Sequence, residues 1–152
     1  MVEASADGTF TELEVAGVRG GMFAFIVGII TMVAGVTLII AGIVTWMEVS
    51  SQLEAESVTV AADASCQAGE PVDGPVTAWC QAEVINTHAL EATGGLTYAE
   101  LGLDDPLRAV AASASFLRAS LFTSVVAYGV AAMAMGVGAV FVLIGAVPVV
   151  RR

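Results

Sequence analysis

Charged residues and reactive side chains are scarce in this sequence. Its 152 residues include no lysine, one histidine and two cysteines, and 13% of them are charged, against about 25% in soluble domains. One histidine excludes a two-histidine, one-carboxylate iron site within a single chain, and no phosphate-binding glycine loop or nucleophile-elbow motif occurs. That histidine, His88, lies near Glu83 and Glu91, where a packing or surface role is the simplest interpretation. We therefore expect no enzyme activity, no cofactor, no metal site and no small-molecule substrate.

Positively charged residues are much rarer than negatively charged ones. Five arginines stand against fifteen acidic residues, which gives a net charge of −10. A chain this acidic is disfavoured as a nucleic-acid-binding protein, because phosphates would repel it. We expect the acidic side chains to form a solvated surface.

Charge is missing altogether from two long stretches, residues 20–47 and 119–150. A helix needs about 20 apolar residues to cross a hydrocarbon layer of about 30 Å, and each stretch gives roughly 40 Å of helix. Two such stretches in so short a chain leave too little polar surface to cover both inside a soluble protein. The sequence therefore predicts an all-α integral membrane protein, in contact with the lipid bilayer.

The first charge-free stretch is expected to be a retained anchor. Acidic residues precede it, and its apolar run is longer than the core of a signal peptide. Neither stretch contains an ionisable residue, which disfavours a pump or transporter built from this chain alone. A pore formed by a ring of copies would have to be lined by serine, threonine or glycine.

The arginines predict the orientation. Arg19, Arg151 and Arg152 flank the outer ends of the two stretches, whereas residues 48–118 contain two arginines and eleven acidic residues. Positive residues favour the cytoplasmic side, so both termini are predicted to be cytoplasmic and the loop 48–118 extracytoplasmic. Arg118 lies on the outer side, where its side chain can reach the interface. The predicted divisions are a cytoplasmic tail at 1–19, a transmembrane helix at 20–47, an extracytoplasmic domain at 48–105, a long helix at 106–148 whose first two or three turns lie outside, and a cytoplasmic end at 149–152.

Both cysteines, Cys66 and Cys80, fall in the predicted outer segment. Their spacing matches neither a redox CxxC motif nor part of a zinc site. An oxidising location favours a disulfide between them. The alternative is a pair of small buried apolar residues.

The outer segment is predicted to be mostly helical. Residues 56–60, ESVTV, read as a short strand or an extended link, and glycines and prolines mark a loop before Pro75. A helix is predicted from Pro75 to the Gly94-Gly95 pair, with one apolar face formed by Val76, Trp79, Cys80, Val84, Thr87 and Leu90. A capping box at Thr97 and Glu100, and a start signal at residues 104–106, precede an unbroken helix of about forty residues.

Small residues repeat along both charge-free stretches. The first stretch carries a seam at spacings of three and four: Gly21, Ala24, Gly28, Thr31, Gly35, Leu38, Gly42 and Thr45. The second carries a matching seam: Ser120, Ser124, Ala127, Ala131, Ala134, Gly138, Phe141 and Gly145. Small residues let helices approach closely in lipid, and hydroxyls can add hydrogen bonds between them.

These two seams predict an antiparallel two-helix transmembrane hairpin. In the register that we expect, Gly21 faces Gly145, Gly35 faces Ala131, and Thr45 faces Ser120. Leu38 then meets Ala127, and Phe141 meets Ala24. The alternative is that the seams pack against another subunit.

Part of the chain resembles a known group of proteins. The run GPVTAWCQAEVINTHALEATGGLTYAEL (residues 74–101) and the run ASFLRASLFTSVVAYGV (114–130) resemble small two-span membrane proteins of actinobacteria, which are often mislabelled "aromatic ring-opening dioxygenase". The resemblance implies an actinobacterial plasma-membrane protein of uncharacterised activity and transfers no catalytic residue. The single histidine contradicts the dioxygenase label, and the two cysteines lie outside the group's common core.

Two functional hypotheses follow. The first is a non-catalytic accessory or scaffold subunit of a larger membrane complex, with a respiratory oxidase assembly as one candidate. The second is a self-assembling membrane protein, either channel-like or an extracellular sensor stalk. The expected partners are therefore other membrane-protein subunits or copies of this chain.

Overall fold

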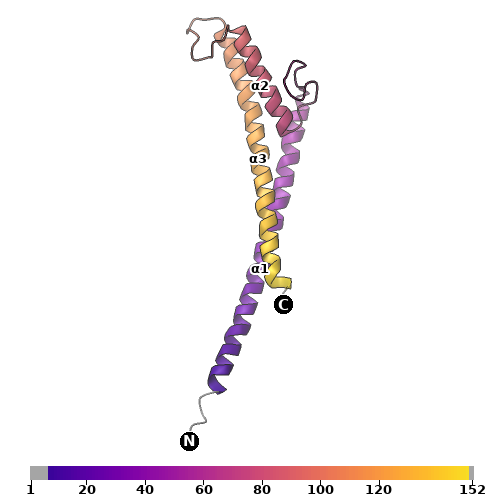
Figure 1. The fold of residues 1–152 in the computed structure, drawn as a ribbon, viewed down its shortest axis with the longest axis vertical. Coiled ribbons are helices and arrows are strands. Elements are labelled where there is room, and N and C mark those ends of the chain that lie inside the picture. Colours follow the sequence, from indigo (N-terminus) through magenta and orange to yellow (C-terminus); the bar gives the residue numbers. More distant parts are fainter. Residues whose placement is uncertain (1–6, 151–152) are drawn as a thin grey trace. The chain divides into compact units, whose positions relative to one another are not determined.

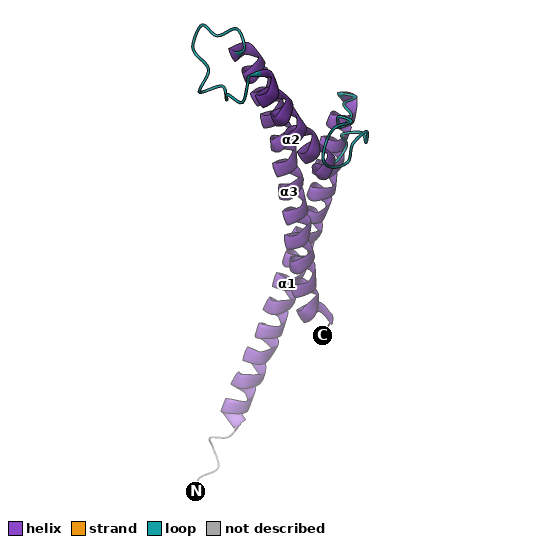
Figure 2. Ribbon diagram, turned by 45° about the horizontal axis from the view of Figure 1, so that its top comes forward, coloured by secondary structure: helices purple, strands orange, loops and turns teal. Residues whose placement is uncertain are grey.

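The computed structural model describes the backbone of residues 7–150 and the side chains of residues 21–150. Three helices form in this range: α1 (Asp7–Ala55), α2 (Pro75–Ala92) and α3 (Arg108–Val150), all labelled in Figure 1. Between residues 7 and 150 there is no strand (Figure 2), and one isolated bridge pairs Thr59 with Pro71. The predicted all-helical class is confirmed.

The long helices contain the two charge-free stretches. The predicted span 20–47 lies within α1, which continues to Ala55 because residues 48–55 include neither glycine nor proline. The helix ends just before Ser57, whose φ of 52° is left-handed. The predicted helix of about forty residues is confirmed as α3, which has 43 residues and includes Pro148 in its last turn.

Helix α2 has its predicted ends, and part of its predicted apolar face is buried. Pro75 occupies the first turn, and Gly94 and Gly95 follow the helix with φ of 65° and 89°. Of the predicted apolar face, Cys80 and Val84 are buried, whereas Val76 and Trp79 are at least half exposed. The other buried residues of α2 are Ala78 and Ala82. Alanine suits this face because α2 lies along the first turns of α3 (Figures 1 and 2), and small side chains permit a close approach.

The predicted capping box forms its hydrogen bonds without starting a helix. The Glu100 carboxylate accepts bonds from the Thr97 amide at 2.8 Å and from the Thr97 hydroxyl at 2.7 Å. Residues 98–100 are a turn, and α3 begins only at Arg108. The predicted helix start at residues 104–106 forms a capping hydrogen bond just before α3: the Asp105 carboxylate accepts from the Leu107 amide at 2.8 Å.

The chain divides into two compact units. The first contains residues up to Ala41 and those from Ala134 onward, and it brings α1 and α3 into contact. The second contains Gly42–Met133, with α2, the loops and the adjoining turns of the long helices. Its core consists of Val60, Val72, Ala78 and Cys80, against which Leu53, Ala64, Leu121 and Val125 pack.

Two helical segments are long and apolar enough to cross a membrane. They are Gly21–Ala55, with a mean hydropathy of 2.7 in its most apolar part, and Arg108–Val150, with 2.4. Only 11% of the first apolar part and 17% of the second are buried within the chain. Most of their apolar surface is therefore left uncovered by the protein itself.

Candidate functional site

The first unit is held together by backbone contacts at glycine. A Cβ atom added at Gly28 would lie 2.7 Å from the carbonyl oxygen of Gly145 and 2.5 Å from Cγ of Pro148. The reciprocal atom added at Gly145 would lie 2.5 Å from the Gly28 oxygen. No real Cβ fits at such distances, so this crossing of α1 and α3 requires glycine on both sides.

A second pair of glycines repeats the contact two turns away. A Cβ at Gly35 would lie 2.6 Å from the Gly138 oxygen, and a Cβ at Gly138 would lie 2.6 Å from the Gly35 oxygen. Because Gly28 meets Gly145 and Gly35 meets Gly138, the two helices run in opposite directions where they touch. Close approach of this kind is typical of helices in lipid, where the hydrophobic effect does not drive them together.

The other seam residues fall into groups by burial. Gly42 and Ala131, which continue the two series by seven residues, are both buried. Half-buried positions on the seams are Thr31, Leu38, Ser124, Ala127 and Ala134. Exposed positions are Gly21, Ala24, Thr45, Ser120 and Phe141.

The predicted register of the seams was wrong by seven residues. Gly145 lies against Gly28 rather than Gly21, and Gly35 lies against Gly138 rather than Ala131. The error has a simple cause: both seams repeat every seven residues, so sliding one helix by that amount again sets small residues against small ones. Gly21 has nothing within 4 Å of its Cβ position, and Phe141 and Ala24, predicted to meet, are both exposed.

The predicted hydrogen bonds between the helices are replaced by bonds within each helix. The Thr31 hydroxyl donates to the Val27 carbonyl at 2.9 Å, and the Ser124 hydroxyl donates to the Ser120 carbonyl at 3.3 Å. Serine and threonine commonly bond back to the preceding turn in this way. Backbone proximity, not side-chain hydrogen bonding, therefore characterises the contact.

Tyr128 is the central residue of the second unit. Its side chain is 1% exposed, and its ring packs edge-on against Trp46 with centroids 4.6 Å apart. Its hydroxyl donates to the Asp73 carbonyl at 2.9 Å and lies 2.8 Å from the Ser50 hydroxyl. One side chain on α3 thus connects α1 with the loop before α2. The sequence analysis missed this role, although a lone tyrosine in an apolar run is the signal that pointed to it.

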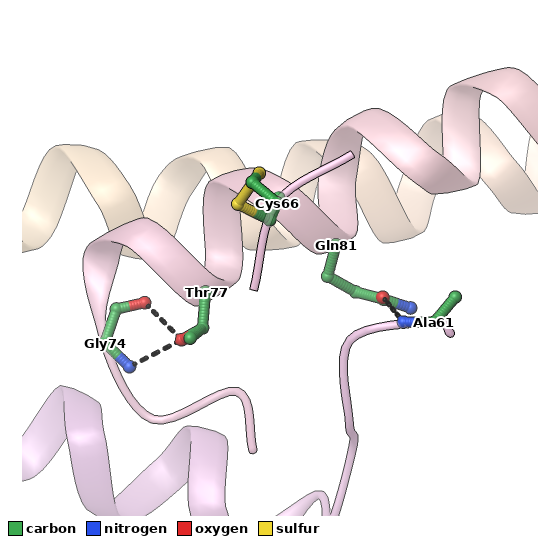
Figure 3. The surroundings of a disulfide bond; sticks show 6 residues. Ala61, Cys66, Gly74, Thr77 and Gln81 are labelled. Carbon is green, nitrogen blue, oxygen red and sulfur yellow. Dashed lines mark hydrogen bonds between the residues drawn. A yellow bond between two sulfur atoms is a disulfide. The ribbon is translucent and has the colours of Figure 1, made fainter. Parts of the chain in front are cut away.

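The loop before α2 is fastened to that helix at several points. A disulfide joins Cys66 to Cys80, whose Cα atoms are 5.7 Å apart (Figure 3). The Ala61 amide donates to the Gln81 side-chain oxygen at 3.0 Å, and the Thr77 hydroxyl bonds the backbone of Gly74. The segment read as a short strand or link contributes the bridge at Thr59. The disulfide predicted from the sequence is thus part of a wider set of links.

His88 makes a contact that the sequence analysis did not predict. Its Nε2 lies 2.6 Å from a carboxylate oxygen of Asp63, and both side chains are about half exposed. The hydrogen bond to the Asp63 carboxylate raises the pKa of His88 above its usual 6.5, with Coulombic attraction to Asp63 as the next cause. The same bond lowers the pKa of Asp63 below 3.8. The pair joins the loop to α2 and has no third ligand: no cluster of three metal-binding side chains occurs in the described part of the chain.

Arg108 and Arg118 both have partners in the second unit. The guanidinium of Arg108 lies 4.0 Å above the Tyr98 ring and donates to the carbonyls of Tyr98 and Leu101. Arg118 donates through Nε to the Ala82 carbonyl at 3.2 Å, and its nearest carboxylate oxygen, on Glu83, is 3.8 Å away. Arg118 therefore belongs to the packing of α3 against α2. Side chains at Arg19, Arg151 and Arg152, on which the predicted orientation also depends, lie outside the described residues.

No protein-family model matches the chain, and neither the curated proteins nor the solved structures contain a match to it.

Proposed function

We propose that this chain is a non-catalytic integral membrane protein whose α1 and α3 cross the bilayer as an antiparallel hairpin. The observation that carries the proposal is the low burial of two long apolar helices. Helices in the core of a soluble protein are covered by their own chain, whereas these expose large side chains such as Phe23, Ile30 and Leu143 along their length. Lipid is the solvent that suits such surfaces.

The outer boundary of the bilayer is proposed to lie near Trp46 and Tyr128. Tryptophan and tyrosine favour the interface between lipid and water, and these two rings are in contact. From Tyr128 to Val150 the helix extends roughly 33 Å, which matches a hydrocarbon layer of about 30 Å. On this proposal the turns of α3 before Tyr128 lie outside with α2, which is more than the two or three turns predicted from the sequence.

The second unit is proposed to face the extracytoplasmic side. The arginine distribution favours this side under the positive-inside rule. The disulfide between Cys66 and Cys80 also suits an oxidising compartment. Both termini would then be cytoplasmic.

Within the membrane, the chain is proposed to act as an accessory or scaffold subunit of a larger complex, with a respiratory assembly as a candidate. Supporting this role, α3 has a second pair of glycines, Gly129 and Gly136, whose Cβ positions have nothing within 4 Å. Exposed glycines seven residues apart offer another transmembrane helix a close approach. The same observation favours the second candidate function, a homo-oligomer, if the added helix comes from another copy.

Native mass measurement after gentle solubilisation tests the proposal. A complex containing different chains is expected, and a Gly136→Leu variant should release this subunit from them. A ring of identical chains would favour the homo-oligomer instead. Recovery of the protein in the soluble fraction, without detergent, would contradict both candidates.

A further inference from the structure

The outer turns of α3 border a hollow that the second unit leaves open. It has a volume of about 340 Å³ and is lined by Tyr98, Ala112, Ser115, Phe116 and Ala119. Phe116 exposes 79% of its surface and Tyr98 exposes 43%. The lining combines two aromatic rings with small side chains, and a hollow of this size and character can receive one large apolar side chain.

A smaller hollow of about 80 Å³ adjoins the first and shares Tyr98 and Ser115 with it. Its lining adds polar groups, among them Asn86, Thr97 and Arg118. No acidic residue lines either hollow within the described part of the chain, although residues 48–118 include eleven acids. We call the two hollows together the Tyr98 groove.

Positive charge borders this groove from both arginines of the outer segment. Arg108 is stacked on Tyr98, and its guanidinium donates to the backbone carbonyls of Tyr98 and Leu101. Arg118 lines the smaller hollow. Its guanidinium lies 3.8 Å from a carboxylate oxygen of Glu83, and at this distance it can still donate to a second carboxylate that comes closer. The only two arginines of a strongly acidic outer segment therefore lie in or beside the Tyr98 groove.

We propose that the Tyr98 groove docks an extracytoplasmic segment of a partner protein. The segment inserts one aromatic or large aliphatic side chain beside Phe116 and sets a neighbouring carboxylate against Arg118. Aromatic residues and arginine are the usual anchors of protein interfaces, and the acid-free lining gives local charge complementarity. This inference rests on the proposed accessory role, since it supplies the outer contact with the partner.

A second copy of this chain is a poorer occupant. Residues 48–118 contain two arginines and eleven acids, a net charge of 2 − 11 = −9. Two such surfaces repel each other as they approach. The groove therefore favours a chain of different composition.

Model peptides test the recognition chemistry on the full-length protein in nanodiscs of zwitterionic lipid. Three fluorescent peptides share one sequence, with a central tryptophan followed by glutamate, the same tryptophan followed by glutamine, or alanine followed by glutamate. The first should bind at least about fivefold more tightly than either of the others. Equal binding of all three would overturn the proposal.

Two adjacent exposed residues provide a matched pair of variants. Phe116→Ala removes a wall of the groove and should weaken binding of the first peptide about fivefold or more. Leu117→Ala, at a residue that is 56% exposed and outside the groove lining, should leave binding within about twofold. Arg118→Gln should remove the preference for glutamate over glutamine. Similar losses in the 116 and 117 variants would overturn the proposal.

Crosslinking in cells separates this inference from the proposed function. A photoreactive residue placed at 116 should crosslink to the chain that co-purifies with this protein, and one placed at 117 should not. Crosslinks to a second copy, or to lipid, would overturn the groove proposal. If another chain co-purifies but crosslinks only from 117, the groove proposal fails and the accessory role stands. If no other chain co-purifies, the accessory role itself fails.

Discussion

Individual glycines differ sharply in what they face. Gly35 and Gly138 lie against each other's backbone, whereas Gly21, Gly129 and Gly136 have nothing within 4 Å of their Cβ positions. The sequence presents all of them as small residues in apolar helices. Only their positions in the folded chain distinguish a glycine that permits helix contact from one that faces outward.

Enlarging Gly35 should separate α1 from α3. The Gly35→Leu variant forces a side chain into a space where even a Cβ would lie 2.6 Å from a backbone oxygen. We expect its free energy of unfolding in detergent to fall by about 1–3 kcal/mol. Gly136→Leu, which enters open space, should not lower it. Thermal unfolding of the two variants makes the comparison, and equal losses would show that Gly35 does not face α3.

The contact between His88 and Asp63 should depend on pH in a defined direction. Because the pKa of His88 is raised, the stabilisation of the fold by protonated His88 is fully present below pH 6.5 and is lost as pH rises through the raised pKa. Because the pKa of Asp63 is lowered, the stabilisation of the fold by ionised Asp63 is present above pH 3.8 and is lost as pH falls through the lowered pKa. The loop should therefore be held most firmly between these two values.

An NMR titration of the His88 imidazole checks this assignment. Asp63→Asn should return the pKa of His88 toward its usual value, because the hydrogen bond to the Asp63 carboxylate is the largest cause of the shift. Glu91→Gln is the matched control, since attraction to Glu91 is the smallest cause. A larger change in the Glu91 variant than in the Asp63 variant would refute the pairing.

Removing the Tyr128 hydroxyl should destabilise the second unit. In Tyr128→Phe, the buried contacts to the Asp73 carbonyl and the Ser50 hydroxyl are lost, at a cost of about 1–3 kcal/mol. Tyr98→Phe, at a ring that is 43% exposed, should cost less. Chemical unfolding followed by tryptophan fluorescence would measure both. The account fails here if Tyr128→Phe is as stable as the parent protein.

At the scale of elements, the disulfide holds an irregular loop against a regular helix. Cys66 and Cys80 are 14 residues apart in the sequence, and a closed loop of this size stabilises a fold by roughly 3 kcal/mol under the chain-entropy model. The double variant Cys66→Ser with Cys80→Ala should lose about that much. Limited proteolysis should then cut residues 61–74 first. Unchanged protease resistance would mean that the hydrogen bonds around Gln81 and Thr77 are enough to hold the loop.

The ends of α2 could be predicted from the sequence, because they depend on residues close by in the chain. Pro75 and the Gly94-Gly95 pair predicted the two ends of α2, because proline fixes its own φ near the helical value and glycine adopts the left-handed φ that ends a helix without steric cost. The buried face of α2 was not predictable in the same way. It depends on α3 packing close enough to select Ala78 and Ala82 over larger neighbours, and that choice is made by tertiary contacts.

At the scale of the whole molecule, the register of the long helices is the feature that sequence could not supply. Seams that repeat every seven residues fit equally well after a shift of seven. In the structure, Tyr128 reaches Trp46 and Ser50 within the second unit, while Gly28 meets Gly145 in the first. The two long apolar helices, by contrast, could be recognised directly in the sequence, because an apolar span is defined by its composition.

The central claim, that a membrane separates the second unit from the end of α3, is tested most directly by cysteine labelling in intact cells. Both native cysteines are in the disulfide, so a single introduced cysteine reports its own position. A membrane-impermeant thiol reagent should label Gly102→Cys in intact cells and should label Val150→Cys only after the cells are permeabilised. Labelling of both positions in intact cells, or of Val150→Cys alone, would contradict the account.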